Sequence, residues 1–384
     1  MNNIRHIFNE MKNNSIKIKK NISSIEGLSF CRNRLYSDIG NNGDLRIHSN
    51  KGNIVNHYVT HHKSFVNNRF GAHKCQLDRL TFFSTESKSI LGRFIDCRNN
   101  SKTYGKFVEI KIPCNPDIQL EIPPGVAHSF DNINSVVTRN DMSTYVSPSV
   151  TANDLFEDDV YVCTNKFDDI KEVLSSLPKI TPSTLELPPE ASVPFFGMIT
   201  KNLVDDTIPI GIMGSCIREL NYHSWAEKSY ILLPTQKNCI SETLILSSKN
   251  EINTFEVHTL SDSFYTFLAP EGNKIHVELI DLREYSETYN KKSIIEINIS
   301  VNNILEIPSG VAFRFSHEDK VISRVEYKNY YDANNKLDEH ISFDINNSDL
   351  KVDISRKLNT GKIEIPEKAL IQMYAKEAKE YFLL

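Results

Sequence analysis

Histidines are the residues of this sequence best suited to proton transfer or metal ligation, and three of the twelve stand at related positions. His73 in GAHKCQ and His258 in FEVHTL lie 185 residues apart, and His128 follows the turn in EIPPGVAHSF. An imidazole accepts or returns a proton near pH 7, and the neutral ring also ligates metal ions. The three positions therefore direct attention to proton transfer and to metal binding.

The spacing of 185 residues recurs along much of the chain. EIPPGVAHSF at 121–130 returns as EIPSGVAFRF at 306–315, and FIDCRNNSKTYGKF at 94–107 returns as LIDLREYSETYNKK at 279–292. The same frame aligns further pairs, namely His73 with His258, Arg139 with Arg324, and Tyr145 with Tyr330. Matches that stay in one frame from position 73 to position 145 indicate a duplicated domain.

Each copy is predicted to consist of short β-strands. The first contains LTFFST, SILGRFIDC, KFVEIKI and IQLEI, which are rich in β-forming residues and separated by polar turns. After IQLEI, a Pro pair stops strand pairing and Gly125 supplies a conformation that a Cβ would penalise, as Gly310 does in the second copy. The next strand begins at a barrel rim, where His128 can point into the lumen. The pattern predicts an all-β protein of sandwich or jelly-roll type.

The segments outside the two copies differ from them in composition and in the spacing of their apolar residues. FDDIKEVLSSL at 167–177 has helical spacing, PKITPSTLELPPEASVPF at 178–195 is Pro-rich, and PEKALIQMYAKEAKEYFLL at 366–384 reads as an amphipathic helix. We therefore expect four parts: a first barrel domain at 1–165, a partly helical, Pro-rich connector at 166–225, a second barrel domain at 226–360 and a C-terminal helix at 361–384.

The composition is that of a globular chain. Of 384 residues, 40% are hydrophobic and 24% are charged. The net charge of −5 shows no excess of basic residues that would indicate nucleic-acid binding. Seven cysteines without a CxxC motif are typical of reduced thiols. The first twenty residues hold no apolar core of a secretory signal, and no apolar run approaches the roughly 18 residues that span a bilayer. We expect a cytoplasmic protein with no nucleic-acid partner and no membrane partner.

Several segments resemble the motifs of one enzyme family in order and spacing. They are GAHKCQ around His73, IDCRNNSKTYGKFVEI, EIPPGVAHSF and MSTYVSPS at 142–149, with AND at 152–154 as the remnant of a fifth. These segments are similar to those of the dTDP-4-dehydrorhamnose 3,5-epimerase family, cupin enzymes of sugar-nucleotide metabolism. The resemblance covers about 30–160 well and about 230–350 more weakly. It implies two cupin-type jelly-roll barrels (double-stranded β-helices) in tandem.

The resemblance also implies a reaction, which is removal of a proton from the carbon next to the 4-keto group of a nucleotide-linked sugar. It makes His73 the base and Asp154 the carboxylate that orients it, with His258 and Asp344 as counterparts in the second copy. A donor or cation must stabilise the enolate oxygen. The predicted substrate-binding residues are Arg69, Lys74, His128, Arg139, Tyr145, Arg324, Tyr327 and Tyr330. The tyrosines at 145 and 330 match the family residue that stacks on the nucleotide base. The implied partner is a nucleotide-diphosphate sugar, and no cofactor is implied.

The sequence departs from the family at the second catalytic position. The family has a tyrosine there, whereas this chain has Arg139 in the first copy and Arg324 in the second. A guanidinium stays charged and is a poor proton donor at pH 7. Tyr327 would replace the missing tyrosine only if its strand carried a bulge. Because His128 becomes Phe313, the two pockets cannot be chemically equal, and we expect the first to be the better preserved.

Other functions compete with epimerisation. A metal-binding cupin pattern is half matched by PPGVAHSFDN, but its other half reads His73-Lys74-Cys75 and would need His61 or His62 as well, so we predict no metal. A 3,4-ketoisomerase-like cupin moves the proton on one face and does not need the tyrosine. A third reading is a catalytically inactive bicupin that binds a nucleotide sugar or a glycan.

Duplication suggests how the two copies are used. Family epimerases are dimers whose barrels exchange strands, so the resemblance implies that the two halves pair as an internal pseudo-dimer, with a homodimer of the whole chain left open. It also implies a role in surface polysaccharide or O-antigen synthesis.

Overall fold

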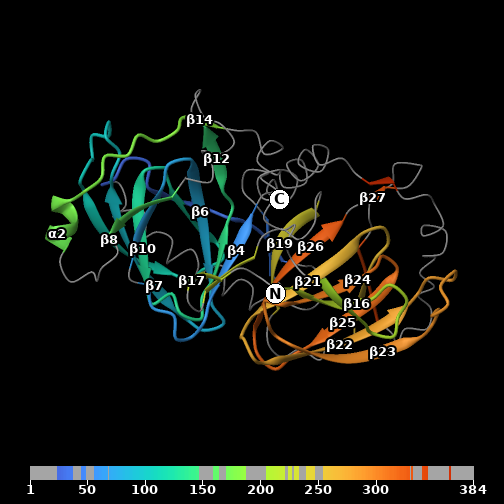
Figure 1. Ribbon diagram of the computed structural model, residues 1–384. Helices are drawn as coiled ribbons and strands as arrows, with labels where there is room; N and C mark the ends of the chain where they lie inside the picture. The colour runs from blue at the N-terminus through green and yellow to red at the C-terminus, as the bar shows by residue number, and fades with distance from the viewer. Residues whose placement is uncertain are drawn as a thin grey trace. The chain divides into compact units, whose positions relative to one another are not determined.

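Two compact units make up the chain, and each is described by itself. Unit 1 comprises Met1–Asn33, Val55–Phe195 and Ser224–Ile231, and unit 2 comprises Arg34–Ile54, Phe196–His223 and Leu232–Leu384. The structure, a computed structural model, describes residues 24–37, 45–48, 56–67, 69–146, 159–163, 170–186, 205–220, 224–226, 229–232, 239–246, 254–328, 330–331, 340–344 and 363–364. Over this part the secondary structure is almost entirely β, and its helix is the short α2 (Ile170–Ser175) (Figure 1).

Unit 1 contains two antiparallel sheets. The larger runs in the order β1 (Ser29–Arg32), β9 (Ile118–Ile122), β6 (Gln76–Phe83), β11 (Val137–Asn140), β4 (His57–His61), β18 (Ser229–Leu232) and β17 (Ser224–Ala226), and β12 (Ser143–Val146) and β14 (Leu185–Glu186) attach to it beside β6. The smaller runs β13 (Asp159–Cys163), β5 (Phe70–His73), β10 (Val126–Asp131), β7 (Ser89–Asp96) and β8 (Phe107–Pro113).

Unit 2 repeats this arrangement. Its larger sheet runs β15 (Asp205–Pro209), β16 (Cys216–Leu220), β24 (Asn303–Ile307), β21 (Asp262–Ala269), β26 (Val321–Lys328), β19 (Cys239–Leu246), β3 (Leu45–His48) and β2 (Arg34–Ser37). Its smaller sheet runs β23 (Lys292–Asn298), β22 (Lys274–Asp281), β25 (Val311–Ser316), β20 (Thr254–His258) and β28 (His340–Asp344). A separate pair is formed by β27 (Tyr330–Tyr331) and β29 (Ile363–Glu364).

The two sheets of each unit enclose an apolar core. In unit 1, Leu80 and Phe82 of the larger sheet pack with Phe94 and Phe130 of the smaller. In unit 2, Tyr265 and Phe267 of the larger sheet pack with Phe313 and Phe315 of the smaller. Alternate residues of each strand therefore face a lumen between the sheets. The predicted fold class, an all-β chain with two cupin-type jelly-roll barrels in tandem, is confirmed.

The last strands of each larger sheet come from the other half of the sequence. In unit 2, β3 pairs with β19 and β2 with β3, although both follow directly after β1 of unit 1 in the chain. In unit 1, β18 lies next to β4 and β17 next to β18, although both follow the first barrel. Each sheet is thus completed by a hairpin from the opposite half of the sequence.

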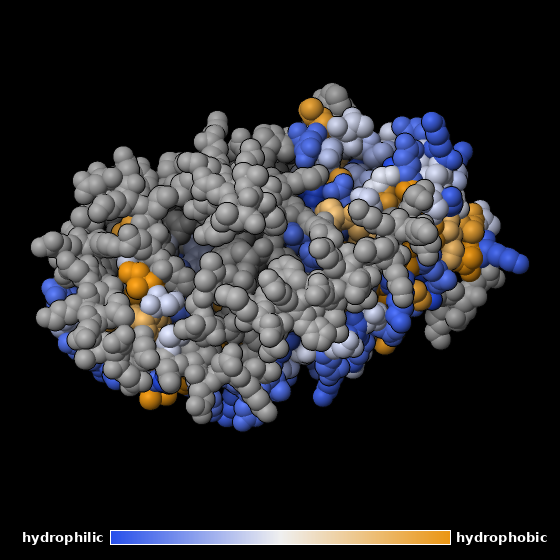
Figure 2. Space-filling view, turned by 180° about the vertical axis from the view of Figure 1, so that it is seen from behind, coloured by the Kyte–Doolittle hydropathy of each residue, from blue (hydrophilic) through white to orange (hydrophobic). Residues whose placement is uncertain are grey.

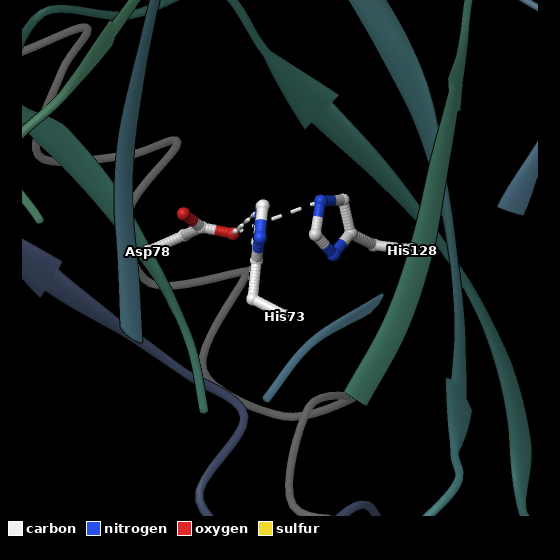
Figure 3. A group of neighbouring side chains, drawn as sticks. All are labelled: His73, Asp78 and His128. Atoms are coloured by element: carbon white, nitrogen blue, oxygen red, sulfur yellow. Dashed lines mark ion pairs between the residues drawn. The ribbon is translucent and has the colours of Figure 1, made fainter. Parts of the chain in front are cut away.

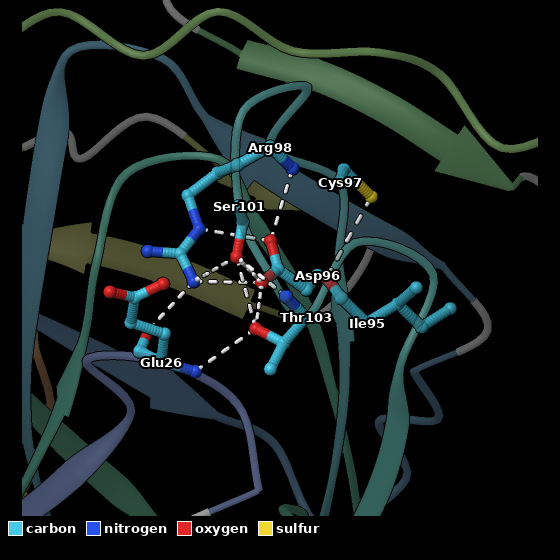
Figure 4. A network of polar contacts seen from close by, with 7 residues as sticks. All are labelled: Glu26, Ile95, Asp96, Cys97, Arg98, Ser101 and Thr103. Carbon is cyan, nitrogen blue, oxygen red and sulfur yellow. Dashed lines mark hydrogen bonds and ion pairs between the residues drawn. The ribbon is translucent and has the colours of Figure 1, made fainter.

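The most strongly repeated segment forms a polar network that holds one end of the barrel (Figure 4). In unit 1 the buried Asp96 accepts hydrogen bonds from Arg98 Nε at 2.9 Å, Ser101 Oγ at 2.6 Å and Thr103 Oγ1 at 2.5 Å. Burial alone would raise the pKa of Asp96, but these donors outweigh burial and hold the pKa below its ordinary value. The counterparts in unit 2 surround Asp281 in the same way: Arg283, Ser286 and Thr288.

The PPG turn packs against this network. Gly125 has a φ of +81°, and a Cβ at this position would lie 2.5 Å from Arg98 Cγ. Glycine is therefore required both by the left-handed backbone and by the close approach of the arginine. The turn and the network, the two strongest repeats in the sequence, form one structural unit that starts β10.

The described surface mixes polar and apolar side chains. Val66 in unit 1 is 80% exposed and Ile294 in unit 2 is 72% exposed. In the view of Figure 2, hydrophilic and hydrophobic residues are interspersed over the coloured part. None of the described helices is long and apolar enough to cross a membrane. The expected C-terminal helix lies outside the described residues except for Ile363–Glu364, and the expected domain boundaries stay predictions.

Candidate functional site

A cluster of two histidines and one aspartate lies inside the first barrel (Figure 3). Nε2 of His73 and Nε2 of His128 are each 3.7 Å from the same oxygen, Oδ2 of Asp78. The side chain of Asp78 is 3% exposed, whereas those of His73 and His128 are 25% and 16% exposed. The carboxylate therefore lies at the bottom of the cluster, and the imidazoles lie between it and solvent.

Strand register brings the three residues together. His73 ends β5, and a tight connection leads into β6, where Asp78 faces the lumen on the same side as Leu80 and Phe82. His128 on β10 lies opposite Gly71 of β5, so His73, two residues along, is its diagonal neighbour. A Cβ built on Gly71 would meet nothing within 4 Å, so this face has open space beside both histidines.

Asp78 is an anion that the barrel holds in place. Its Oδ1 accepts hydrogen bonds from Gln76 Nε2 at 2.5 Å and Asn140 Nδ2 at 2.7 Å, which leaves Oδ2 directed toward the histidines. Burial alone would raise the pKa of Asp78, but the positive potential of protonated His73 and His128, together with these two amides, lowers it below the ordinary value. A fixed carboxylate of this kind can orient an imidazole or ligate a cation.

The second nitrogen of His128 has a defined partner. Nδ1 lies 3.3 Å from the carbonyl oxygen of Val126. A carbonyl only accepts, so Nδ1 donates, and Nε2 of the neutral ring carries the lone pair. Nε2 of His128 therefore faces Asp78 either as a lone pair or, in the protonated ring, as a donor.

His57 is a lumen residue that the sequence reasoning missed. It lies on β4 opposite Asn140, the residue whose amide holds Asp78. Its Nδ1 is buried and makes no hydrogen bond to any described residue. Burial lowers the pKa of His57 to about 4, against the attraction of Asp78. The alternation of HYVTH at 57–61 places Tyr58 on the opposite face and could have identified His57 as an interior residue.

Arg139, expected in the pocket, lies on the other face of its sheet. It stands opposite Thr81, one residue away from the lumen-facing Asn140, and its Nε donates to Asp141 Oδ1 at 2.9 Å. Its side chain is fully buried. Arg324 of unit 2 is placed in the same way, opposite Thr266, with Nη2 3.5 Å from Glu326 Oε2. Neighbouring residues of a strand face opposite ways, so neither arginine enters the lumen.

The alternation of side chains along a strand also determines the side of the sheet on which Tyr327 lies. β26 runs in continuous register with β19, without the bulge that the sequence reasoning required. Three residues after Arg324, Tyr327 faces the lumen, and its ring centroid lies 5.1 Å from that of His258. The second barrel thus pairs a histidine with a tyrosine, both nearly buried, at 6% and 4% exposed.

The second barrel lacks the rest of the cluster. The positions of Asp78 and His128 are taken by Ser263 and Phe313, and the ring of Phe313 stacks on His258 with centroids 6.1 Å apart. In the lumen of the second barrel, no carboxylate–imidazole pair occurs among the described residues; the pair of His276 and Glu296 lies on the surface. The two lumens therefore offer different chemistry.

The other expected residues are scattered. Arg69 and Lys74 are exposed on either side of β5. Tyr145 on β12 is half-buried, and burial followed by the charge of Glu186 raises its pKa. Asp154 lies outside the described residues, and for Asp344 and Tyr330 the structure describes only their backbone pairings with Thr254 and Glu364. Other imidazoles are engaged elsewhere: His61 packs against Phe65, and His62 contacts Ser64.

Comparisons with known proteins add likenesses at low similarity. No family model matches the sequence. No curated protein matches it either. A dTDP-4-dehydrorhamnose 3,5-epimerase from Elizabethkingia anophelis is 14% identical, with 41% of this chain and 94% of that chain covered and a TM-score of 0.29. The dTDP-6-deoxy-D-glucose-3,5-epimerase of Legionella pneumophila, solved with dTDP-4-keto-L-rhamnose, is 15% identical over 44% and 87%, with a TM-score of 0.28.

One likeness extends over most of the chain. The oxalate decarboxylase of Lactobacillus farciminis, solved as a formate complex, is 10% identical, with 84% of this chain and 91% of that chain covered and a TM-score of 0.27. Values at this level establish neither a family nor an activity for this chain.

Proposed function

We propose that the first barrel transfers a proton at the carbon next to the carbonyl of a nucleotide-linked keto sugar, with His73 as the base. The observation that carries this proposal is the placement of His73 Nε2 at 3.7 Å from the buried carboxylate of Asp78. The separation is longer than a hydrogen bond, as is common for catalytic pairs before substrate closes the site. On closure, Nε2–H donates to Asp78 and Nδ1 becomes the proton acceptor.

The residue types suit this chemistry. A carbon acid beside a ketone needs a base that works near pH 7, and a carboxylate that fixes the tautomer of an imidazole supplies one. In this proposal Asp78 takes the orienting role instead of Asp154, because Oδ2 of Asp78 lies 3.7 Å from Nε2 of His73. Arg69 and Lys74 flank β5 as exposed cations suited to the diphosphate of the substrate.

The first barrel favours return of the proton on the same face. Arg139 points away from the lumen, and the position of Tyr327 is held in the first copy by Met142, which carries no transferable proton. A single base then takes the proton from the hydroxyl-bearing carbon and returns it to the former carbonyl carbon, while the hydroxyl proton passes to the former carbonyl oxygen, as in an isomerase. We propose isomerisation of a 4-keto sugar as the reaction, and supply of surface polysaccharide or O-antigen synthesis as its use.

Deuterium wash-in tests the proposal. The protein is incubated in D2O with dTDP-4-keto-6-deoxyglucose and the sugar is followed by NMR. Isomerisation predicts deuterium next to the carbonyl together with a new 3-keto product. Label at C3 and C5 with inverted configuration would replace isomerisation by epimerisation. Absence of exchange despite substrate binding would refute the proposal.

A matched pair of variants localises the base. His73→Asn should abolish exchange, because no other group is proposed to take the proton. His276→Gln removes a surface imidazole of unit 2 whose side chain is 55% exposed, and it should exchange like the unaltered protein. Exchange retained in His73→Asn would remove His73 from the mechanism.

A further inference from the structure

We propose that His73, Asp78 and His128 form a binding site for a divalent transition-metal ion, and that an ion bound there blocks proton transfer by His73. The first part stands on the geometry of the cluster alone. The second part rests on the proposed function.

The separations fit three ligands of one ion. One ligand atom from each residue lies within 4.8 Å of the other two, and Nε2 of both histidines lies 3.7 Å from Asp78 Oδ2. The two separations of 3.7 Å to Asp78 Oδ2, in a cluster whose ligand atoms lie within 4.8 Å of one another, leave room for one ion between the three side chains. Zinc bonds to nitrogen and oxygen are roughly 2.0–2.2 Å long, so a small inward shift of the side chains completes the site.

Hydrogen bonds to the other polar atoms of His128 and Asp78 fix these side chains and leave one ligand atom of each for the ion. The carbonyl oxygen of Val126 accepts a hydrogen bond from Nδ1–H of His128, so Nε2 is the lone-pair nitrogen of the neutral ring. Gln76 and Asn140 both donate to Oδ1 of Asp78, which leaves Oδ2 for a cation. Fixing ligands through their second atoms is the usual outer-shell arrangement of protein metal sites. Nε2 of the neutral His128 and Oδ2 of Asp78 are both acceptors. Their proximity is therefore favourable only when a proton or a cation lies between them.

His57 adds an independent observation. Its imidazole faces the lumen beside Asn140, and its buried Nδ1 has no hydrogen-bond partner among the described residues. An unpartnered buried nitrogen carries a desolvation cost that a ligand or an ordered water at the site would offset. Two imidazoles, one carboxylate and a further imidazole nearby suit first-row divalent ions such as Zn²⁺ and Co²⁺.

The second barrel provides an internal contrast. Its counterparts of Asp78 and His128 are Ser263 and Phe313, so only His258 of the three ligands is kept. We therefore infer one ion per chain at this kind of site. The second barrel accommodates phenylalanine at the position equivalent to His128.

The link to proton transfer follows from the tautomers. A metal ion on Nε2 of His73 leaves the ring proton on Nδ1, the atom that must be free to accept the substrate proton. The ion also occupies Oδ2 of Asp78. Proton transfer and metal binding therefore exclude each other, and a bound ion inhibits exchange.

Metal binding is tested on the full chain without substrate. Protein stripped with EDTA is dialysed against Zn²⁺ and its metal content measured, and Co²⁺ is titrated while the visible spectrum is recorded. We expect one Zn²⁺ per chain, and Co²⁺ bands of nitrogen and oxygen ligation. Thiolate-to-Co²⁺ bands in the near ultraviolet, or metal content that saturates nowhere near one, would overturn the site.

Variants assign the ion to this cluster. Asp78→Asn and His128→Phe should each weaken Zn²⁺ binding at least tenfold, and His276→Gln should bind like the unaltered protein. His128→Phe copies the second barrel, and thermal melting shows whether each variant is folded. Unchanged binding in a folded His128→Phe protein would place the ion elsewhere and refute the inference.

Exchange assays separate the two proposals. If the metal-free protein exchanges and Zn²⁺ suppresses exchange, both stand. If Zn²⁺ binds at the cluster but the metal-free protein does not exchange, the proposed function fails and the metal site stands. If Zn²⁺ binds and accelerates exchange, the base role of His73 and the blocking role of the ion both fail.

Discussion

Acidification should destabilise the protein through two buried histidines of the first unit. Burial lowers the pKa of His57 to about 4 and that of His61 to about 3, from an ordinary value of 6.5. Both rings stay neutral in the folded state, whereas the same rings in the unfolded chain take up protons as the pH falls through 6.5. The contribution of the neutral rings is complete above pH 6.5 and is lost as the pH falls toward the folded pKa values.

The size of the effect follows from the shifts. Each pH unit between the two pKa values is worth about 1.4 kcal/mol per histidine. Between pH 7 and pH 5, each ring therefore lowers the free energy of unfolding by about 2 kcal/mol, and the two together by about 4 kcal/mol. A loss of that size is a large part of the stability of a typical domain.

Urea unfolding followed by circular dichroism at pH 7, 6 and 5 measures this loss. His57→Gln and His61→Gln should each reduce the loss between pH 7 and pH 5 by about 2 kcal/mol, whatever they do to stability at pH 7. His276→Gln, on the surface, should leave the loss unchanged. An equal pH dependence in the unaltered protein and in both buried-histidine variants would show that these rings are not held neutral by the fold.

Three further perturbations follow from contacts in the barrels. Gly125→Ala should destabilise unit 1 by about 2 kcal/mol or more in calorimetry, because the new Cβ meets Arg98, whereas Gly105→Ala, at φ +76° with nothing within 4 Å, should cost only about 1 kcal/mol; equal costs would contradict the packing argument. Asp96→Asn should cost about 3 kcal/mol in chemical unfolding because it leaves Arg98 beside a neutral group, and a change under 1 kcal/mol would show that the network contributes little. Asp78→Asn should slow deuterium exchange at least a hundredfold with little change in substrate binding, since an amide favours the wrong tautomer of His73; a change in affinity alone would make Asp78 a binding group.

The sequence predicted the strands and the turns well because these depend on local patterns. Alternating apolar residues, the Pro pair and Gly125 determine where strands begin and end. Because the sequence repeats after 185 residues, the second copy supports each strand predicted in the first. The same frame singled out His73, His128 and His258. The T-Y-G-K segment was read only as a family signature, whereas Asp96 and Thr103 show that it is a structural network.

The composition of the site depended on pairings that no local pattern contains. Asp78 was missed because its role comes from the connection that crosses from β5 in one sheet to β6 in the other, and from a third strand, β10, that brings His128. His57 and Asn140 meet only through the register of β4 and β11. Arg139 and Tyr327 were assigned by alignment to a family position, but strand parity, readable from alternation, places the first outside the lumen and the second inside.

The proposed reaction requires that a carbonyl-bearing sugar reaches the histidine cluster of the first barrel. A crystal structure of the metal-free protein with a nucleotide-linked 4-keto sugar shows whether it does. We expect the sugar in the lumen beside Gly71, with the carbon next to the carbonyl about 3–3.5 Å from His73 Nδ1 and the diphosphate toward Arg69 or Lys74. A sugar bound outside the barrel, or a lumen closed around His73 and Asp78, would contradict the proposed reaction.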